Sequence, residues 1–225
     1  KLTPVGKKVP LGDLPLNLTL SASQRWLAVT NNGQSDQSIQ LYDIRKNSMA
    51  DSVAVGKAWL GLAFSDDDKF LYASGGNDNW IVKFALAGGR LTAVDTLVLG
   101  KPWPALISVA GIALDDSRHL LYAVTRENNS LYTVDTGSGQ VLARYPLGGE
   151  AYTCLLSPDR SRLYISCWGC NQVVLFDAVT QQLDGQVPVG DNPNDLCLSR
   201  NGEWLFVANA NDNTVSVINT RLRKV

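Results

Sequence analysis

The sequence is poor in histidine, in long apolar runs and in clustered charge, and each shortage excludes a class of protein. Its single histidine, His119, excludes sites that need several histidine ligands, such as haem centres and multi-histidine metal sites. No G-x-S-x-G motif accompanies His119, so a Ser-His-Asp hydrolase has little support. No apolar run approaches the roughly 18 residues of a membrane-spanning helix, so none is predicted. A net charge of −1 without a block of lysines or arginines gives no support for nucleic-acid binding.

What the chain does contain is a repeated segment of about 42 residues. A glycine preceded by valine or leucine recurs at nearly even steps, and a serine stands nine residues after most of these glycines. The glycines are Gly12, Gly56, Gly100, Gly148 and Gly190, and the serines are Ser21, Ser65, Ser157 and Ser199. The third copy has Asp115 in place of the serine, after an insertion of six residues within 101–109. We therefore predict repeats at approximately 12–55, 56–99, 100–147, 148–189 and 190–225.

The residue pattern of each repeat predicts four short strands separated by turns. The first is small and apolar, as in 61–64 and 111–114, and a polar turn links it to the second. The third alternates polar and apolar residues, as in 214–218, and the fourth is a short apolar stretch such as 53–55, 97–99 or 187–189. No segment has helical periodicity. Tandem units of this kind predict an all-β fold, a β-propeller of four-stranded antiparallel blades with five repeats present.

The last copy resembles a known family. Its second strand, 205–209, reads Leu-Phe-Val-Ala-Asn, and 213–219 reads Asn-Thr-Val-Ser-Val-Ile-Asn, which is similar to the YVTN-type β-propeller repeat. That family includes surface-layer-like and exported bacterial proteins, and related propellers include lactonases. The stretches 150–154 and 192–195 also resemble propellers that precede a phosphoesterase domain in large exported bacterial proteins. The resemblance implies a periplasmic or extracellular location in a bacterium.

The two ends of the chain predict a longer propeller. Residues 220–225 have the spacing that leads into a fourth strand at 136–141, so another outer strand is expected to begin there. Residues 1–11 are predicted to be the outer strand of a neighbouring or closing blade. We expect seven blades in total, because an open arc leaves blade faces and strand edges exposed.

Four cysteines are present, and two of them form a Cys167-Trp-Gly-Cys170 motif in a turn between two strands. A strand-to-strand turn does not favour a thioredoxin-like redox site, and Asn171 stands where haem attachment needs a histidine. A short disulfide and a pair of free thiols both remain open for this motif. Cys154 and Cys197 lie in innermost strands and are predicted to be buried as small apolar residues.

The loops that surround one mouth of a propeller's channel carry the candidate binding residues. They are the connections from a fourth strand to the next first strand and from a second strand to a third. Aromatic rings beside lysine, arginine, glutamate and asparagine suit a polar, ring-shaped ligand such as a sugar, or a peptide loop of a protein partner. The candidates are Lys57, Trp59, Lys101, Trp103, Arg126, Glu150, Tyr152, Trp168, Asn192, Asn194 and Asn209. Alternatively the asparagines serve turn geometry and the aromatics pack loops onto blades, although Trp103 in the inserted loop fits this explanation least well.

Three functions are weighed. The first is a non-catalytic ligand- or protein-binding propeller of an exported bacterial protein, accessory to a downstream hydrolase. The second is a lactonase-like, metal-dependent hydrolase with oxygen ligands from Glu150, Asn192, Asn194 and Asp195. The third is a purely structural repeat. We expect no cofactor, no resident metal and no catalytic residue in the first case.

Overall fold

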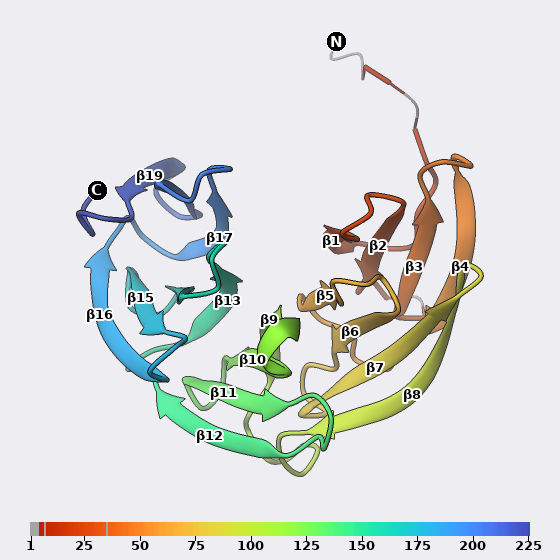
Figure 1. Cartoon of the computed structure of the whole chain (residues 1–225), viewed down its shortest axis with the longest axis horizontal. Helices are drawn as coiled ribbons and strands as arrows, with labels where there is room; N and C mark the ends of the chain where they lie inside the picture. Colours follow the sequence, from red (N-terminus) through yellow and green to blue (C-terminus); the bar gives the residue numbers. More distant parts are fainter. Residues whose placement is uncertain (1–4, 7, 35) are drawn as a thin grey trace.

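The computed structural model describes residues 5–6, 8–34 and 36–225. They form an all-β propeller of five antiparallel sheets, or blades, in an arc that is open between the first and the last (Figure 1). Within each blade the strands follow sequence order, from the innermost near the centre of the arc to the outermost at its rim (Figure 1). In the described part of the chain, no helix is long and apolar enough to cross a membrane. The five antiparallel blades confirm the predicted fold class, an all-β propeller.

Within the described residues, the first four blades have four strands and the fifth has three. Blade one contains β1 (Pro15–Leu20), β2 (Trp26–Asn31), β3 (Ser38–Asp43) and β4 (Ser48–Ala54). Blade two contains β5 (Leu62–Phe64), β6 (Phe70–Ser74), β7 (Trp80–Ala87) and β8 (Arg90–Val98). Blade three contains β9 (Val109–Asp115), β10 (Leu120–Thr125), β11 (Ser130–Asp135) and β12 (Val141–Pro146), with a short 3-10 helix, η1 (Asp116–Arg118), after β9. Blade four contains β13 (Ala151–Leu156), β14 (Arg162–Cys167), β15 (Gln172–Asp177) and β16 (Gln182–Pro188), and blade five contains β17 (Pro193–Leu198), β18 (Trp204–Asn209) and β19 (Thr214–Asn219).

The outermost strands are longer than the sequence pattern predicts. β8 spans 9 residues and β4 and β16 span 7 each, whereas short apolar stretches were expected. These edge strands are largely exposed, so they contain polar as well as apolar residues. Their first residues therefore cannot be recognised from an apolar pattern. Residues 8–11 form no strand, while residues 1–4 and 7 lie outside the described part of the chain. A role for 1–11 in a neighbouring blade stays a prediction.

The described part of the chain has four hydrophobic core layers, one between each pair of adjacent blades. Between blades one and two, for example, Ile39 and Leu41 pack with Leu71 and Phe84. Corresponding layers lie between blades two and three, three and four, and four and five. Because each layer needs two blades, every blade depends on its neighbours for burial of its faces.

Two features of the repeat pattern have simple physical causes. The repeated serine accepts a hydrogen bond from the amide five residues later and so closes the turn between the first two strands, as Ser65 Oγ does for Phe70 N at 2.9 Å. Glycine in an innermost strand allows adjacent blades to approach closely, because a Cβ on Gly111 would lie 2.5 Å from the Thr153 Cα. Both positions thus encode blade geometry.

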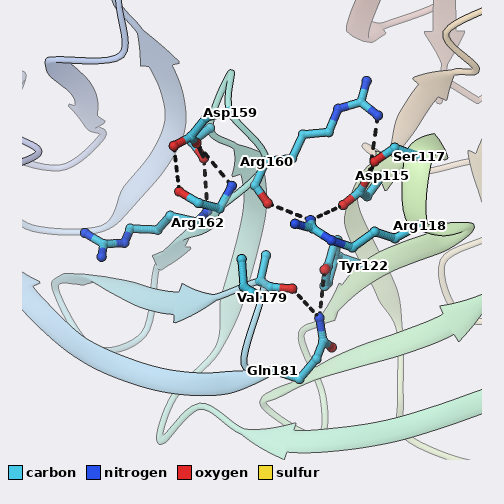
Figure 2. Close-up of polar contacts among 12 residues, drawn as sticks. Asp115, Ser117, Arg118, Tyr122, Asp159, Arg160, Arg162, Val179 and Gln181 are labelled. Atoms are coloured by element: carbon cyan, nitrogen blue, oxygen red, sulfur yellow. Dashed lines mark hydrogen bonds and ion pairs between the residues drawn. The ribbon is translucent and has the colours of Figure 1, made fainter.

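The third blade replaces this serine with a buried carboxylate. Asp115, whose side chain is fully buried, accepts hydrogen bonds from Ser117 and Arg118, and Arg160 of the next blade pairs with it at 3.4 Å (Figure 2). Arg160 also pairs with Asp66 of blade two. Arg160 therefore links blades two, three and four. It does so in the turns between first and second strands, on the face opposite the loops that carry the candidate binding residues.

Candidate functional site

On one face of the arc, the loops that surround the mouth of the channel enclose a small polar cavity, here called the mouth pocket. Its volume is about 230 Å³. Its walls come from the second-to-third-strand connections of blades one, two and three and from the connections between these blades. The lining residues are Asn32, Gln37, Lys57, Trp59, Gly76, Asn77, Ser108, Arg126 and Glu127. The fold thus brings Lys57, Trp59 and Arg126, three of the candidate binding residues, to one pocket.

The two cations of the mouth pocket both have carboxylate partners. Lys57 Nζ lies 2.9 Å from Asp78 Oδ1, and Arg126 Nε donates to Glu150 Oε1 at 2.5 Å. The Arg126 guanidinium also lies 5.6 Å from the centre of the Trp59 ring, within the range of a cation–π contact. The pocket therefore has fixed charges but little unbalanced positive charge.

Two polar atoms of the lining are shielded from solvent and have no hydrogen-bond partner among the residues that the structure describes. They are the indole Nε1 of Trp59, a donor, and the amide Oε1 of Gln37, an acceptor. Leaving such a group unpaired costs about 1–3 kcal/mol.

The insertion of the third repeat forms one side of this face. Trp103 is 62% exposed, and Lys101 is also exposed. The Trp103 amide donates to the Asn77 carbonyl at 3.2 Å, which joins the inserted loop to the wall of the mouth pocket. Trp103 and Lys101 therefore lie beside the pocket and do not line it.

Trp168 and Asn192 form a second group beside the Cys167–Cys170 turn. Cys167 and Cys170 are joined by a disulfide, which resolves the alternative that the sequence left open. Asn192 Nδ2 donates to the Trp168 carbonyl at 3.0 Å and so connects the disulfide turn to blade five. Trp168 itself is half-buried.

Glu150 contacts both the mouth pocket and the disulfide turn. Its side chain accepts from Arg126, and its carbonyl accepts from the Gly169 amide at 3.1 Å. Two residues later, burial raises the pKa of the Tyr152 hydroxyl, and the charges of Arg126 and Asp195 also act on it.

Two predicted residues have roles inside the fold. Asn209 is 2% exposed, and its Nδ2 donates to Thr214 Oγ1 and Ser216 Oγ. Asn194 Oδ1 accepts from the Asp195 amide at 2.6 Å, and its carbonyl accepts from Ser166 Oγ at 2.7 Å. These contacts favour the alternative explanation, in which asparagines serve the geometry of turns and strands.

Some residues of this face were not predicted. Asn32 and Gln37 line the mouth pocket, and fully buried Asn79 holds the inserted loop. Asn79 has a φ of 60°, a conformation that asparagine tolerates better than most residues. Asn129 and Asn171 occupy the same position, directly before a third strand, and also have positive φ. The sequence pattern therefore indicates a turn residue at Asn79, but it does not indicate the contact with the inserted loop.

One further correction concerns the free cysteines. Cys154 is buried as predicted, but Cys197 is exposed, so the prediction that both are buried is wrong for Cys197. Cys197 pairs with Phe206 in the sheet and shares its face, which no other blade in the described structure covers. His119 ends η1 with a φ of 55°, which is consistent with a turn residue.

No cluster of three or more histidine, cysteine, aspartate or glutamate side chains suited to a metal occurs in the ranges that the structure describes. Of the oxygen donors considered for a hydrolase, Glu150 pairs with Arg126 and Asn192 Oδ1 accepts from Asn211. Both of these donors are therefore engaged in contacts within the protein.

Comparisons with known proteins agree that the chain is a β-propeller. A family model described as "Lactonase, 7-bladed beta-propeller" matches residues 149–223. The uncharacterized protein YncE of Salmonella typhimurium is 25% identical over 153 residues, which cover 68% of this chain and 42% of the relative. Hydrazine synthase subunit beta of Kuenenia stuttgartiensis is 35% identical over 122 residues, covering 41% of this chain and 32% of that protein. The chain spans less than half the length of these curated relatives.

Solved structures show the same fold at low sequence identity. Hydrazine synthase of Kuenenia stuttgartiensis superposes with a TM-score of 0.62 at 18% identity, covering 92% of this chain and 83% of the other. A Bacteroides uniformis protein provisionally assigned as a 6-phosphogluconolactonase gives a TM-score of 0.76 at 15% identity, covering 92% and 67%. At such identities the likeness supports the propeller fold alone.

Proposed function

We propose that this chain is a non-catalytic binding propeller whose mouth pocket takes a small, neutral, polar ring such as a monosaccharide. The observation that carries the proposal is the mouth pocket itself. It places an aromatic ring, Trp59, among amide and charged side chains from three blades. Its lining includes one donor and one acceptor that have no partner within the described part of the chain. A sugar ring offers both an apolar face for stacking and hydroxyls that donate and accept hydrogen bonds.

Size and charge narrow the class of ligand. A cavity of about 230 Å³ lies just below the ~300–1,000 Å³ typical of pockets for drug-sized ligands, so it suits a single ring. Lys57 and Arg126 are balanced by Asp78 and Glu150, and Glu127 adds a negative charge to the lining. A sulfated or phosphorylated sugar would have to displace one of these carboxylates, which favours a neutral ligand.

The wider setting is also proposed. A disulfide between Cys167 and Cys170 is typical of oxidising compartments and supports an exported protein. The similarity to a protein named as a subunit of hydrazine synthase supports a role as one part of a larger assembly. Attachment to a hydrolase, as an accessory platform, belongs to the same proposal.

Calorimetric titration with a panel of neutral monosaccharides tests the pocket. We expect at least one to bind, and Trp59→Ala to weaken that binding by about tenfold or more, because the stacking surface is lost. Trp204→Ala, which removes an exposed tryptophan from blade five, is the matched control and should leave binding unchanged. Circular dichroism confirms that each variant is folded. Absence of binding by every sugar, or undiminished binding by folded Trp59→Ala, contradicts the proposal.

A second candidate is a metal-dependent lactone hydrolase, which the description of the matching family model favours. In that case calcium, magnesium, manganese or zinc should raise the melting temperature, and lactone opening should depend on Glu150. Unchanged melting with all four ions, together with no lactone opening, would remove this candidate. If neither sugars nor ions act, a purely structural role is left.

A further inference from the structure

The inserted loop, residues 101–107, is held in place by one buried side chain. Asn79 is fully buried, and its Nδ2 donates to the carbonyls of Lys101 at 2.6 Å and Ala105 at 2.7 Å. Its Oδ1 accepts from the Ser108 amide at 2.8 Å. Three hydrogen bonds from a single asparagine therefore fix both ends of the loop and its middle.

This fixed loop directs its large aromatic side chain to solvent. Trp103 stands between Pro102 and Pro104 and belongs to none of the interblade core layers. Proline on both sides restricts the backbone, so a ligand that contacts Trp103 does not have to pay for ordering the loop. Tryptophan is also among the residues that contribute most to binding energy at interfaces.

The platform is continuous with the mouth pocket. Gly76 lies between the two tryptophans, because a Cβ there would meet Trp59 Cβ at 3.5 Å while the next residue, Asn77, accepts from the Trp103 amide. Ser108, at the end of the inserted loop, also lines the pocket. One face thus runs from Trp59 past Gly76 and Asn77 to Trp103.

We infer that this face binds an oligosaccharide, with one sugar ring in the mouth pocket and a following ring against Trp103. The inference rests on the proposed function and extends it from a single ring to a chain. Sugar rings in a chain present apolar faces at successive positions, and two aromatic side chains on one rigid face can stack on two of them. The loop has no charged residue after Lys101, so the second position also suits a neutral ring.

The test compares neutral monosaccharides with short oligomers of the same unit, using glucose and N-acetylglucosamine series, by calorimetric titration and tryptophan fluorescence. For the wild-type chain, affinity should rise by about tenfold or more from one unit to three. Trp103→Ala should abolish this gain and leave monosaccharide affinity unchanged, because the pocket is intact. Leu106→Ala is the matched control, since Leu106 is exposed on the same loop and lacks a ring; it should keep the gain.

Each outcome decides between explanations. Affinity that does not depend on chain length, or a gain that survives in Trp103→Ala, overturns the inference while monosaccharide binding preserves the proposed function. Equal losses in Leu106→Ala and Trp103→Ala also overturn it and indicate an apolar surface for a protein partner. If the wild-type chain binds none of the sugars, neither monosaccharides nor oligomers, the proposed function itself is overturned.

Discussion

Equivalent faces of the first and fifth blades differ sharply in burial. In blade one the face toward blade two carries Trp26, Ala28, Ile39 and Leu41, which are between 0% and 7% exposed. The corresponding residues of blade five are Trp204, Phe206, Val215 and Val217, and these are 39% to 59% exposed. Both sets are apolar and occupy the same strand positions. The difference shows that a repeat pattern marks which residues can be buried, while a neighbouring blade decides which are.

The exposed face of blade five that carries Trp204, Phe206, Val215 and Val217 is here called the open face. It has the composition of a blade interface but, within the described residues, no blade lies against it (Figure 1). Contiguous exposed apolar surface of this kind favours association. The seven-bladed description of the matching family model is consistent with further blades in a longer protein, which stays a prediction.

The largest expected effect tests the comparison directly. Trp26→Ala should lower the free energy of unfolding by about 3–5 kcal/mol, because it leaves a cavity between two blades. Trp204→Ala removes the same side chain from a partly exposed position and should cost less than about 1 kcal/mol. Urea unfolding followed by circular dichroism measures both. Equal losses would show that the fifth blade's face is covered in solution, for instance by self-association, which sedimentation then checks.

A smaller effect is expected in the middle of the arc, where polar contacts supplement the apolar layer. Burial alone would raise the pKa of Asp115, but hydrogen bonds from Ser117 and Arg118 and the charge of Arg118 outweigh it and leave the pKa below its ordinary value. Asp115→Asn should cost about 2 kcal/mol at neutral pH, reduced from the ~3–5 kcal/mol of a fully buried pair because the arginines are partly exposed.

The pH dependence of that loss has a defined sign. A depressed pKa means that the contribution of Asp115 is present above its unfolded value of about 3.9 and is lost as the pH falls through the folded value. The stabilities of wild type and Asp115→Asn should therefore converge in acid. Urea midpoints from pH 7 down to about pH 3 measure this, and a constant difference between the two proteins would contradict it.

The smallest perturbation is chemical labelling, which reports burial without changing the fold. Cys197 on the open face should react with iodoacetamide in the native chain, whereas Cys154 should not, since it is buried and burial raises the pKa of its thiol. Cys167 and Cys170 should react only after reduction. Mass spectrometry of labelled peptides gives the result. Protection of Cys197 in the native state would mean that the open face has a partner.

The fold was largely predictable because its signals are local. The serine that closes the first turn and the alternation of the third strands depend on neighbours in the chain. The serine therefore recurs in four of the five copies, with Asp115 in the third, and the alternation is visible in the third strands. The outer strands were underestimated because solvent, not a second blade, faces much of their surface. Asn209 was included in the site because its turn belongs to the correct face, but its side chain points into hydrogen bonds of its own blade.

The repeat, the β-propeller class and the set of loops that surround the mouth can all be read from the order of residues. Lys57, Trp59 and Arg126 are expected on one face, because equivalent loops of successive blades must lie side by side. Three findings required the folded chain: these residues share a pocket, Asn79 holds the loop of Trp103, and Cys197 is exposed. Those outcomes depend on contacts between blades, and a periodic pattern does not contain the distances across an interface.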